Sequence, residues 1–417
     1  TTALSAFHAG NGYPLTTLAE IYEFDDPKAR DSEQVVCTGN EALGYGILAA
    51  GVRFGAGYPI TPWSDIMELL RRELPKYDGI FVQCEDEIAA VSMAIGASWG
   101  GQCAITGSSG PGIALKGEAI GWAVMAEIPL IVVDVQRGGP STGMPTNVEQ
   151  SDLNIACFGG HGDSPRVVLA PASVEDCFYT AIEAVNIARE YSTPVIILTD
   201  QAIATRIEAF GMPKLKEVCQ DISPDLTPRE DHKPYDLSAP DGKTQHAAPG
   251  TYIKSGKYPV VTGLEHNEMG HPSGSPKMHL DMNAKRRRKL QALGRALPKP
   301  EVFGPEEGNV LLVGWGSTQG SLREATERAR KAGDSVSALT IRHINPLPDG
   351  LEDIFAGFNH VYVVENNDEG LYGYGQLCAL LRAKYCDPKI EGINKTDGLT
   401  WRVKDVLARV QAKLEEK

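Results

Sequence analysis

The sequence predicts an α/β protein with a buried parallel sheet covered by helices on both faces. Two observations lead to this prediction. Apolar runs of five or six residues alternate with stretches of helical periodicity, which is the pattern of strand–helix–strand units. The runs are predominantly apolar rather than alternately polar, which is typical of strands buried on both sides. They include residues 80–84, 102–106, 129–135, 194–198 and 309–314.

The first series of these elements extends from Gln34 to about residue 210. Small residues from Gly39 to Ala50 predict a helix, and Arg53–Tyr58 predicts the strand that follows it. Further helices are expected over residues 63–74, 86–98, 113–126 and 173–189, with a short strand at 167–169.

Residues 211–302 differ in composition, because they are rich in Pro, Gly, His and charge and have few periodic apolar positions. We expect a long surface connection that ends in a helix around Lys285–Lys289, with this basic run facing solvent. A second α/β pattern begins near residue 309. The predicted organisation is an N-terminal arm or the tail of an absent upstream domain (1–34), a first domain (35–210), an extended linker (211–302), a second domain (303–390) and a C-terminal helix (391–417).

The composition argues against several classes of protein. The 417 residues carry a formal net charge of −14, whereas a nucleic-acid binder normally presents a basic face. The eight cysteines include no CxxC pair, so the chain signals neither a zinc site nor an iron–sulfur cluster, and a reducing cytoplasmic location is expected. No apolar run approaches the roughly 18 residues that span a bilayer, so no membrane partner is expected.

The stretch Tyr58-Pro59-Ile60-Thr61-Pro62 joins a predicted strand to a predicted helix. Pro62 suits the first position of that helix, where its missing N–H costs nothing. Thr61 is therefore expected as the helix N-cap, at the carboxyl end of a strand, where open α/β sheets bind ligands. The simpler interpretation is that Thr61 only caps the helix, as threonine commonly does.

Glu85-Asp86-Glu87 stands between a predicted strand and a helix of small residues. Acidic residues in a first helical turn are favoured by the helix dipole at ~0.3–1 kcal/mol each, which is the simpler explanation. Glu87, however, enters the apolar run Ile88–Ala97. A carboxylate on the buried face of that helix needs a partner, and this is the second interpretation of Glu87.

Arg137 follows the predicted strand that ends at Val135 and begins the glycine-rich segment Arg137–Thr146. An arginine at a strand end in such a turn suits the bidentate capture of a carboxylate. The alternative is an ordinary surface arginine.

Two glycine-rich turns do not match the nucleotide-binding motifs they resemble. Gly107–Gly112 is followed by Ile113 rather than the lysine of a phosphate-binding loop. Gly314-x-Gly316-x-x-x-Gly320 is one residue too long for a dinucleotide fingerprint, and the next predicted strand ends without an acid for a ribose. We therefore expect no phosphate-binding loop at the first place and a plain tight turn at the second.

The combination of these motifs resembles one family, the α subunits of 2-oxoacid:ferredoxin oxidoreductases. The resemblance covers about residues 36–385. Each motif is weak by itself, and the set is specific. The matching motifs are Gly39–Ala42, Gly57–Pro62, Glu85–Ala90, Gly96–Ser98, Ser109–Gly112, Glu127–Pro129, Gln136–Arg137, Gly139–Thr146, Gly263–His266, Gly314–Ser317 and Val364–Asn366.

The resemblance implies a thiamine pyrophosphate enzyme. The first domain would be a pyrimidine-binding domain, and the second a transketolase C-terminal-like α/β domain. Glu87 would supply the carboxylic acid at the pyrimidine ring nitrogen that such a cofactor needs. Tyr58, Pro59 and Ile60 would also contact the cofactor.

The resemblance also implies roles in substrate binding. Thr61 would hydrogen-bond the oxoacid group near the reacting carbon, and Arg137 would bind the substrate carboxylate. Gly139–Thr146 together with Trp63 is most similar to the 2-oxoglutarate branch of the family.

The chain departs from the complete enzymes in two ways. It has no Gly-Asp-Gly…Asn run to hold Mg²⁺ and the diphosphate, and it lacks the four-cysteine set of a [4Fe-4S] cluster. The resemblance therefore implies that both lie on a separate β subunit, in a dimer of heterodimers. Ferredoxin would accept the electrons, coenzyme A would be the co-substrate, and this chain alone would be inactive.

The expected reaction is the oxidative decarboxylation of 2-oxoglutarate to succinyl-CoA and CO₂ with reduction of ferredoxin, or the reverse, carbon-fixing carboxylation. Pyruvate and branched-chain 2-oxoacids stay open as substrates, because few substitutions shift a side-chain pocket. Two other classes also stay open, namely a subunit of a lipoate-linked 2-oxoacid dehydrogenase and a non-catalytic α/β regulatory subunit.

Overall fold

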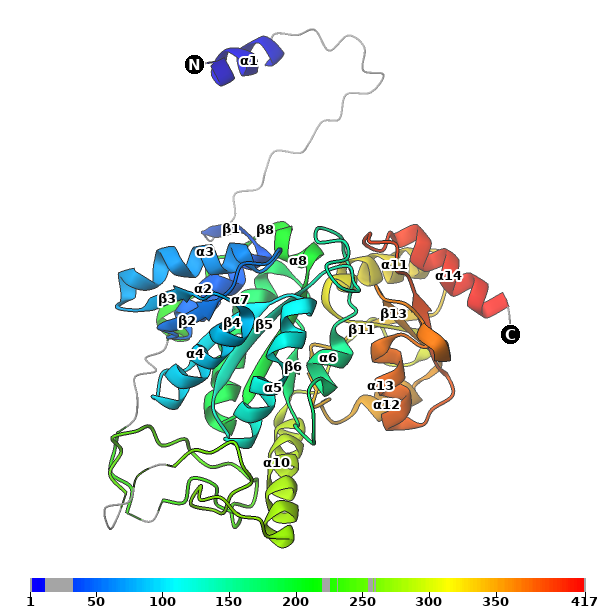
Figure 1. The fold of residues 1–417 in the computed structure, drawn as a ribbon. Coiled ribbons are helices and arrows are strands. Elements are labelled where there is room, and N and C mark those ends of the chain that lie inside the picture. The colour runs from blue at the N-terminus through cyan, green and yellow to red at the C-terminus, as the bar shows by residue number, and fades with distance from the viewer. Residues whose placement is uncertain are drawn as a thin grey trace.

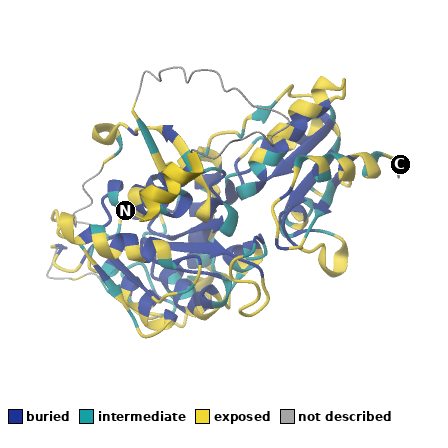
Figure 2. Ribbon diagram, turned by 90° about the horizontal axis from the view of Figure 1, so that it is seen from above, coloured by how far each residue is buried: buried dark blue, intermediate teal, exposed yellow. Residues whose placement is uncertain are grey.

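The computed structural model describes residues 2–11, 33–219, 226–230, 232–253, 258 and 260–415. Its main chain forms a seven-stranded sheet, a five-stranded sheet and a two-stranded sheet. The two larger sheets lie side by side, each with its own helices (Figure 1). The central strands of the two larger sheets are buried, whereas most helices bury only the side that faces a sheet (Figure 2).

The seven-stranded sheet has the order β12-β6-β7-β5-β4-β2-β3. All of its neighbours pair in parallel except β12, which is antiparallel to β6. Its strands are β2 (Phe54–Gly57), β3 (Ile80–Gln83), β4 (Ala104–Ser108), β5 (Leu130–Gln136), β6 (Val167–Leu169), β7 (Pro194–Asp200) and β12 (His343–Asn345).

Helices cover both faces of this sheet. One apolar core joins one face to α2 (Gly39–Ala49), α3 (Ser64–Glu73) and α7 (Val174–Tyr191). A second core joins the other face to α4 (Glu87–Trp99), α5 (Gly110–Met125) and α6 (Leu153–Phe158). The shorter elements of this part are η1 (Leu74–Tyr77), α8 (Gln201–Thr205), α9 (Leu215–Val218) and the antiparallel pair β1 (Gln34–Thr38) and β8 (Ile207–Gly211).

The strand order reverses between β2 and β4. The chain leaves β2 toward α3 on one face and leaves its neighbour β4 toward α5 on the other face. A crevice opens at such a point outside the carboxyl ends of the two strands, and this is where open α/β sheets bind ligands.

The five-stranded sheet has the order β14-β13-β10-β11-β9 and is parallel except for β9. Helices α11 and α14 pack on one face, and α12 and α13 pack on the other. The core under α4–α6 continues into the second of these faces, so the two domains share apolar packing. The elements are β9 (Val302–Phe303), β10 (Gly308–Gly314), η3 (Gly316–Thr318), α11 (Gln319–Lys331), β11 (Val336–Thr340), α12 (Leu351–Ala356), β13 (Phe358–Glu365), η4 (Gly370–Tyr372), α13 (Gln376–Tyr385), β14 (Ile390–Asn394) and α14 (Val403–Glu415).

Strand β12 was not predicted from the sequence. It comes from the loop that follows β11, yet it pairs with β6 of the other sheet. A three-residue strand has too few positions to show periodicity, so only its tertiary partner defines it.

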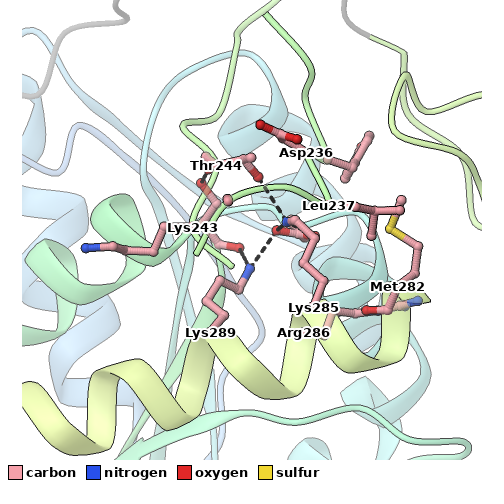
Figure 3. A network of polar contacts seen from close by, with 12 residues as sticks. Asp236, Leu237, Lys243, Thr244, Met282, Lys285, Arg286 and Lys289 are labelled. Atoms are coloured by element: carbon pink, nitrogen blue, oxygen red, sulfur yellow. Dashed lines mark hydrogen bonds and ion pairs between the residues drawn. The ribbon is translucent and has the colours of Figure 1, made fainter. Parts of the chain in front are cut away.

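The expectation of a solvated basic helix at residues 285–289 is wrong. These residues lie in α10 (Pro276–Ala296), where Lys285 and Lys289 are one helical turn apart and point to the same carboxylate. Both Glu127 oxygens lie 2.7 Å from Lys285 Nζ, and one lies 2.8 Å from Lys289 Nζ. Figure 3 shows the two lysines converging beside Thr244, which also accepts from Lys285. Of the basic run, Arg287 is exposed.

The N-terminal arm was predicted over residues 1–34. Within it the structure describes α1 (Thr2–Asn11), which has no buried residue, and the start of β1. Residues 12–32 of this predicted arm lie outside the described residues.

Candidate active site

The candidate site lies at the carboxyl edge of the seven-stranded sheet, at the crevice between β2 and β4. The residues that follow four neighbouring strands lie at this edge. These are Tyr58–Trp63 after β2, Cys84–Glu87 after β3, Ser109–Gly112 after β4 and the loop that starts at Arg137 after β5.

Thr61 is not the helix N-cap that the sequence predicts. Helix α3 begins at Ser64, with Trp63 in the cap position and no side-chain capping bond. The reason is a turn closed by the hydrogen bond from Ser64 N to Ile60 O at 3.0 Å, which places Pro62 before the helix. Thr61 is thereby exposed in the crevice instead of covering the helix end.

Buried contacts hold the Thr61 turn from below. Asn40, in the first turn of α2, donates to the Pro62 carbonyl over 2.9 Å. Trp63 is fully buried against β4, where a Cβ at Gly107 would come within 2.3 Å of the indole ring. Only glycine fits at that position, so the turn and the strand below it form one rigid unit. Along the turn, Tyr58 is 37 % exposed, Pro59 is exposed and Ile60 is half-buried.

The structure brings Arg137 and Thr61 together. Arg137 Nη1 donates to the Thr61 carbonyl over 2.7 Å, and only 6 % of the arginine is exposed. Burial lowers the pKa of Arg137, and the nearby Asp152 carboxylate acts against that change. Arg137 Nε is buried without a hydrogen-bond partner among the described residues. This guanidinium therefore has hydrogen-bonding capacity left for an anion.

Glu87 is the first residue of α4 and is 8 % exposed. The helix-dipole explanation applies to its neighbour, because Asp86 caps the helix by accepting from Ala89 N over 2.8 Å. Within the described residues, no hydrogen bond engages the Glu87 carboxylate. A Cβ at Gly112 would lie 2.7 Å from Glu87 Oε1, so the glycine at this point leaves room for the carboxylate.

Sequence reasoning missed Lys116. This residue is fully buried under the start of α4, and its Nζ donates to the Glu87 carbonyl over 2.9 Å. Burial lowers the pKa of Lys116 to about 8, although the Glu87 carboxylate acts to raise it. A sequence signal existed, since Lys116 falls on the apolar stripe of α5 with Ile113 and Ile120.

Two carboxyl groups were also missed, of which Asp134 is fully buried and Asp152 is half-buried. Asp134 lies on β5 opposite Ser108 of β4, and neither of its oxygens has a partner among the described residues. Burial, and then the neighbouring Asp152, raises the pKa of Asp134 well above its usual range. Burial raises the pKa of Asp152 to about 6, with Glu149 adding to the rise. A single acid inside the apolar strand 130–135 was the available sequence signal for Asp134.

The donor set suits an organic cofactor better than a metal. Throughout the described ranges, no three His, Cys, Asp or Glu side chains gather to hold a metal ion. A buried carboxylate without a protein partner can hydrogen-bond a ring nitrogen of a ligand in the crevice, and the glycines beside it allow close approach. These features fit the pyrimidine end of thiamine pyrophosphate. None of the helices described is long and apolar enough to cross a membrane.

Comparison with known proteins identifies the family of the chain. The family model described as pyruvate flavodoxin/ferredoxin oxidoreductase, thiamine diP-bdg, matches residues 45–284. The 2-oxoglutarate oxidoreductase subunit KorA of Mycobacterium tuberculosis is 39 % identical over 98 % of this chain, and the chain spans 62 % of that subunit. The 2-oxoglutarate synthase subunit KorA of Methanocaldococcus jannaschii is 36 % identical over 75 % of this chain, which spans 83 % of that subunit.

Solved structures show the same relationship. A 2-oxoglutarate:ferredoxin oxidoreductase from Magnetococcus marinus, with 2-oxoglutarate, coenzyme A and succinyl-CoA bound, has a TM-score of 0.89 at 36 % identity. The match covers 99 % of this chain and 70 % of that one. A split-gene transketolase, at 14 % identity and a TM-score of 0.53, shares the fold and so confirms the predicted fold class. The chain belongs to the family of 2-oxoacid:ferredoxin oxidoreductase α subunits, in its 2-oxoglutarate branch.

Proposed function

We propose that this chain is the α subunit, or the corresponding part, of a 2-oxoglutarate:ferredoxin oxidoreductase. The complete enzyme converts 2-oxoglutarate and coenzyme A to succinyl-CoA and CO₂ while reducing ferredoxin, or runs the reverse carboxylation. The observation that supports this most is the buried Glu87 carboxylate, which accepts no hydrogen bond from the described residues and lies at the same sheet edge as the Arg137–Thr61 contact. Named relatives from the 2-oxoglutarate branch support the choice of substrate.

Glu87 is the proposed catalytic residue toward the cofactor. Thiamine pyrophosphate, when bound, supplies the thiazolium carbon that attacks 2-oxo groups. Glu87 Oε would hold a proton at the pyrimidine nitrogen, and Lys116 below it keeps a positive charge near that carboxyl group. Tyr58, Pro59 and Ile60 would line the cofactor's edge of the crevice.

Thr61 and Arg137 are the proposed substrate-binding residues. The Thr61 hydroxyl stands on a turn whose carbonyl is fixed by Arg137 Nη1, so the two groups keep a constant relative position. The remaining N–H capacity of the guanidinium suits the substrate carboxylate, in a buried setting where charge-assisted hydrogen bonds are strong. Thr61 would donate to, or accept from, the oxoacid group.

A β subunit would complete the site with Mg²⁺, the diphosphate contacts and the [4Fe-4S] cluster, in a dimer of heterodimers. The exposed face of α4 supports this proposal, because it is uncharged next to Glu87. Ile88 and Met93 are 54 % and 42 % exposed there, alongside exposed Ala89, Ser92 and Gly96. Such a face beside a half-built site suits burial against a second chain. The cytoplasmic location stays a prediction.

The test is reconstitution with a β subunit and an assay of ferredoxin reduction that requires 2-oxoglutarate and coenzyme A. Glu87→Gln is expected to lower the rate by about 10²–10⁴-fold, the usual size of a proton-transfer contribution. Glu175→Gln, at an exposed acid in the first turn of α7 and outside the site, is the matched control and should keep the wild-type rate.

The other outcomes separate the alternatives. A preference for pyruvate or branched-chain 2-oxoacids in a substrate panel would move the chain to another branch. Dependence on a lipoyl partner instead of ferredoxin would indicate a dehydrogenase subunit. Full turnover by Glu87→Gln would favour a non-catalytic regulatory role.

A further inference from the structure

Two motifs of the second domain have no role in the site described above. Trp315-Gly316-Ser317 follows β10, and Asn366-Asn367 follows its neighbour β13. The chain leaves β10 toward α11 on one face of the sheet and leaves β13 toward α13 on the other. This is therefore the point at which the strand order of the second sheet reverses, where α/β sheets typically bind ligands.

A residue of the first domain, Gln150, occupies this point. It is fully buried, and its main chain and side chain both bond to the second domain. Gln150 N donates to Asn366 O over 2.7 Å, and Gln150 Oε1 accepts from Asn366 N over 3.1 Å. Gln150 O accepts from Asn367 Nδ2 over 2.9 Å, and Gln150 Nε2 donates to Trp315 O over 2.8 Å. The second domain therefore fixes both the main chain and the side chain of Gln150.

The residues around Gln150 leave little room for any other arrangement of its side chain. Gly316 has φ +56°, and a Cβ there would lie 2.6 Å from Gln150 Nε2, so a side chain at 316 would displace the amide. The buried Glu365 carboxylate organises the floor by accepting from Asn367 Nδ2, Leu377 N and Trp315 Nε1 at 3.0, 2.8 and 3.3 Å.

A second contact lies closer to Arg137. Gly398 O, from the loop that follows β14, accepts from Val148 N over 3.1 Å and from Asn147 Nδ2 over 3.3 Å. Gly398 has φ +74°, and a Cβ there would lie within 2.9–3.0 Å of Asn147 and Met144. The approach of the two loops therefore requires glycine.

These contacts anchor one end of a segment whose other residues are exposed. Residues 139–146 are exposed, and the Gly138–Met144 bridge links them only to themselves. At one end Arg137 is tied to Thr61 O, and at the other the segment is tied to the second domain through Asn147, Val148 and Gln150. Freeing one end would let the backbone of this segment regain conformational entropy, so the anchor to the second domain decides whether the loop is ordered.

We propose that Gln150 and Gly398 are positioning residues through which the second domain fixes the 138–149 loop and, with it, the orientation of Arg137. The part of this inference that concerns the substrate rests on the proposed function. In this view the second domain uses the ligand-binding end of its sheet to hold an element of the neighbouring site.

The first experiment does not depend on catalysis. Hydrogen–deuterium exchange of the full chain would be measured for the wild type, Gln150→Ala and Gly398→Val. We expect faster exchange in peptides covering 138–149, by about tenfold or more, with α2 and α7 unchanged. Arg342→Ala is the matched control, because Arg342 also joins the domains, through Asp176 and Glu183, but does not contact the loop. Wild-type exchange of the loop in both variants would overturn the proposal.

The second experiment uses the reconstituted complex. Gln150→Ala and Gly398→Val should raise KM for 2-oxoglutarate about 10- to 100-fold, because a displacement of about 1 Å can cost 10²-fold, whereas KM for coenzyme A should not change. Gly398→Ala should give a smaller rise, and Arg342→Ala none. A faster-exchanging loop with a wild-type KM would also overturn the proposal. A wild-type complex without activity would reject the proposed function, and the exchange data would still decide the positioning role.

Discussion

At the scale of single residues, the candidate site combines a carboxylate without a hydrogen bond in the described part of the chain, Glu87, and an arginine with a fixed position, Arg137. Glu87 has no hydrogen bond from the described residues, whereas Arg137 is fixed to Thr61 O at 2.7 Å and keeps a buried, unpartnered Nε. Buried polar groups are normally satisfied, so such exceptions require an explanation. Bound cofactor and substrate would satisfy both.

Arg137→Lys tests the arginine. Lysine keeps the charge but loses the planar fork, so it cannot bind both Thr61 O and a carboxylate in the same geometry. We expect KM for 2-oxoglutarate to rise by about 10- to 100-fold, which corresponds to the loss of a charged hydrogen bond of ~1.5–3 kcal/mol. Steady-state kinetics of the reconstituted complex would measure it. Arg53→Lys, whose guanidinium donates to the carbonyls of Leu48 and Val52, is the control and should not change KM.

Asp152→Asn tests the carboxyl pair through pH. The unfolded chain loses the Asp152 proton near pH 4, whereas the folded chain keeps it up to a pKa of about 6. The folded state therefore binds more protons between these values, and its stability falls as pH rises. We expect the free energy of unfolding of the wild type, relative to Asp152→Asn, to drop by on the order of 2–3 kcal/mol between pH 4 and 7.

Urea unfolding of the full chain at a series of pH values would measure this difference. Asp78→Asn, at an exposed position, should follow the wild type. Because Asp134 is coupled to Asp152 by charge, Asp134→Asn should show the same sign. Parallel pH profiles for wild type and Asp152→Asn would contradict the prediction.

At the scale of elements, helix α10 shows how a basic run becomes part of the core. Its position is set by the buried network of Glu127, Lys285 and Lys289 (Figure 3). Burial alone would raise the pKa of Glu127, but the two ammonium groups lower it to about 2. One carboxylate thus balances two buried cations and holds the end of the linker on the first domain.

Two substitutions separate charge balance from packing in this network. Glu127→Gln would leave two buried lysines without a counter-charge, and breaking such a buried pair typically costs ~3–5 kcal/mol. Lys285→Met keeps the Glu127–Lys289 pair and much of the side-chain volume, so we expect a clearly smaller loss. Denaturant unfolding would measure both. Equal losses would show that packing rather than charge holds α10.

At the scale of the whole molecule, the proposed function makes this chain one side of an active site shared with a β subunit. Glu87, Thr61 and Arg137 follow neighbouring strands at one edge of the sheet, and the exposed residues of α4 that come after Glu87 are uncharged. Strand β12 of the second domain pairs with β6 of the first sheet, and Gln150 of the first domain donates to Trp315 O of the second. The two domains are therefore joined by contacts in both directions.

Ala89→Arg tests this view of the assembly. Ala89 is exposed on α4 beside Glu87, and an arginine there would be buried without a partner if a β subunit packs on this face. We expect loss of the complex in size-exclusion chromatography, with the melting temperature of the chain itself unchanged. Ala408→Arg, at an exposed alanine of α14, is the matched control. A complex that forms normally with Ala89→Arg would place the β subunit elsewhere.

Much of the fold and of the site was predictable because it depends on local chemistry. Apolar runs such as 129–135 identified strands, and the strand ends identified Glu87, Thr61 and Arg137 as neighbours, since carboxyl ends of parallel strands share one edge. The sequence by itself therefore determined the fold class and the sheet edge at which the proposed site residues lie.

Only the tertiary structure decided which groups are buried and what they contact. The cap position of Thr61 was wrong because a turn bond from Ser64 to Ile60 moved the helix start. The prediction that Lys285 faces solvent was wrong because its ammonium group forms a buried ion pair with Glu127, 158 positions away. Such long-range pairings leave no local period in the sequence, and for the same reason Gln150 and Gly398 became visible only when the two domains were seen together.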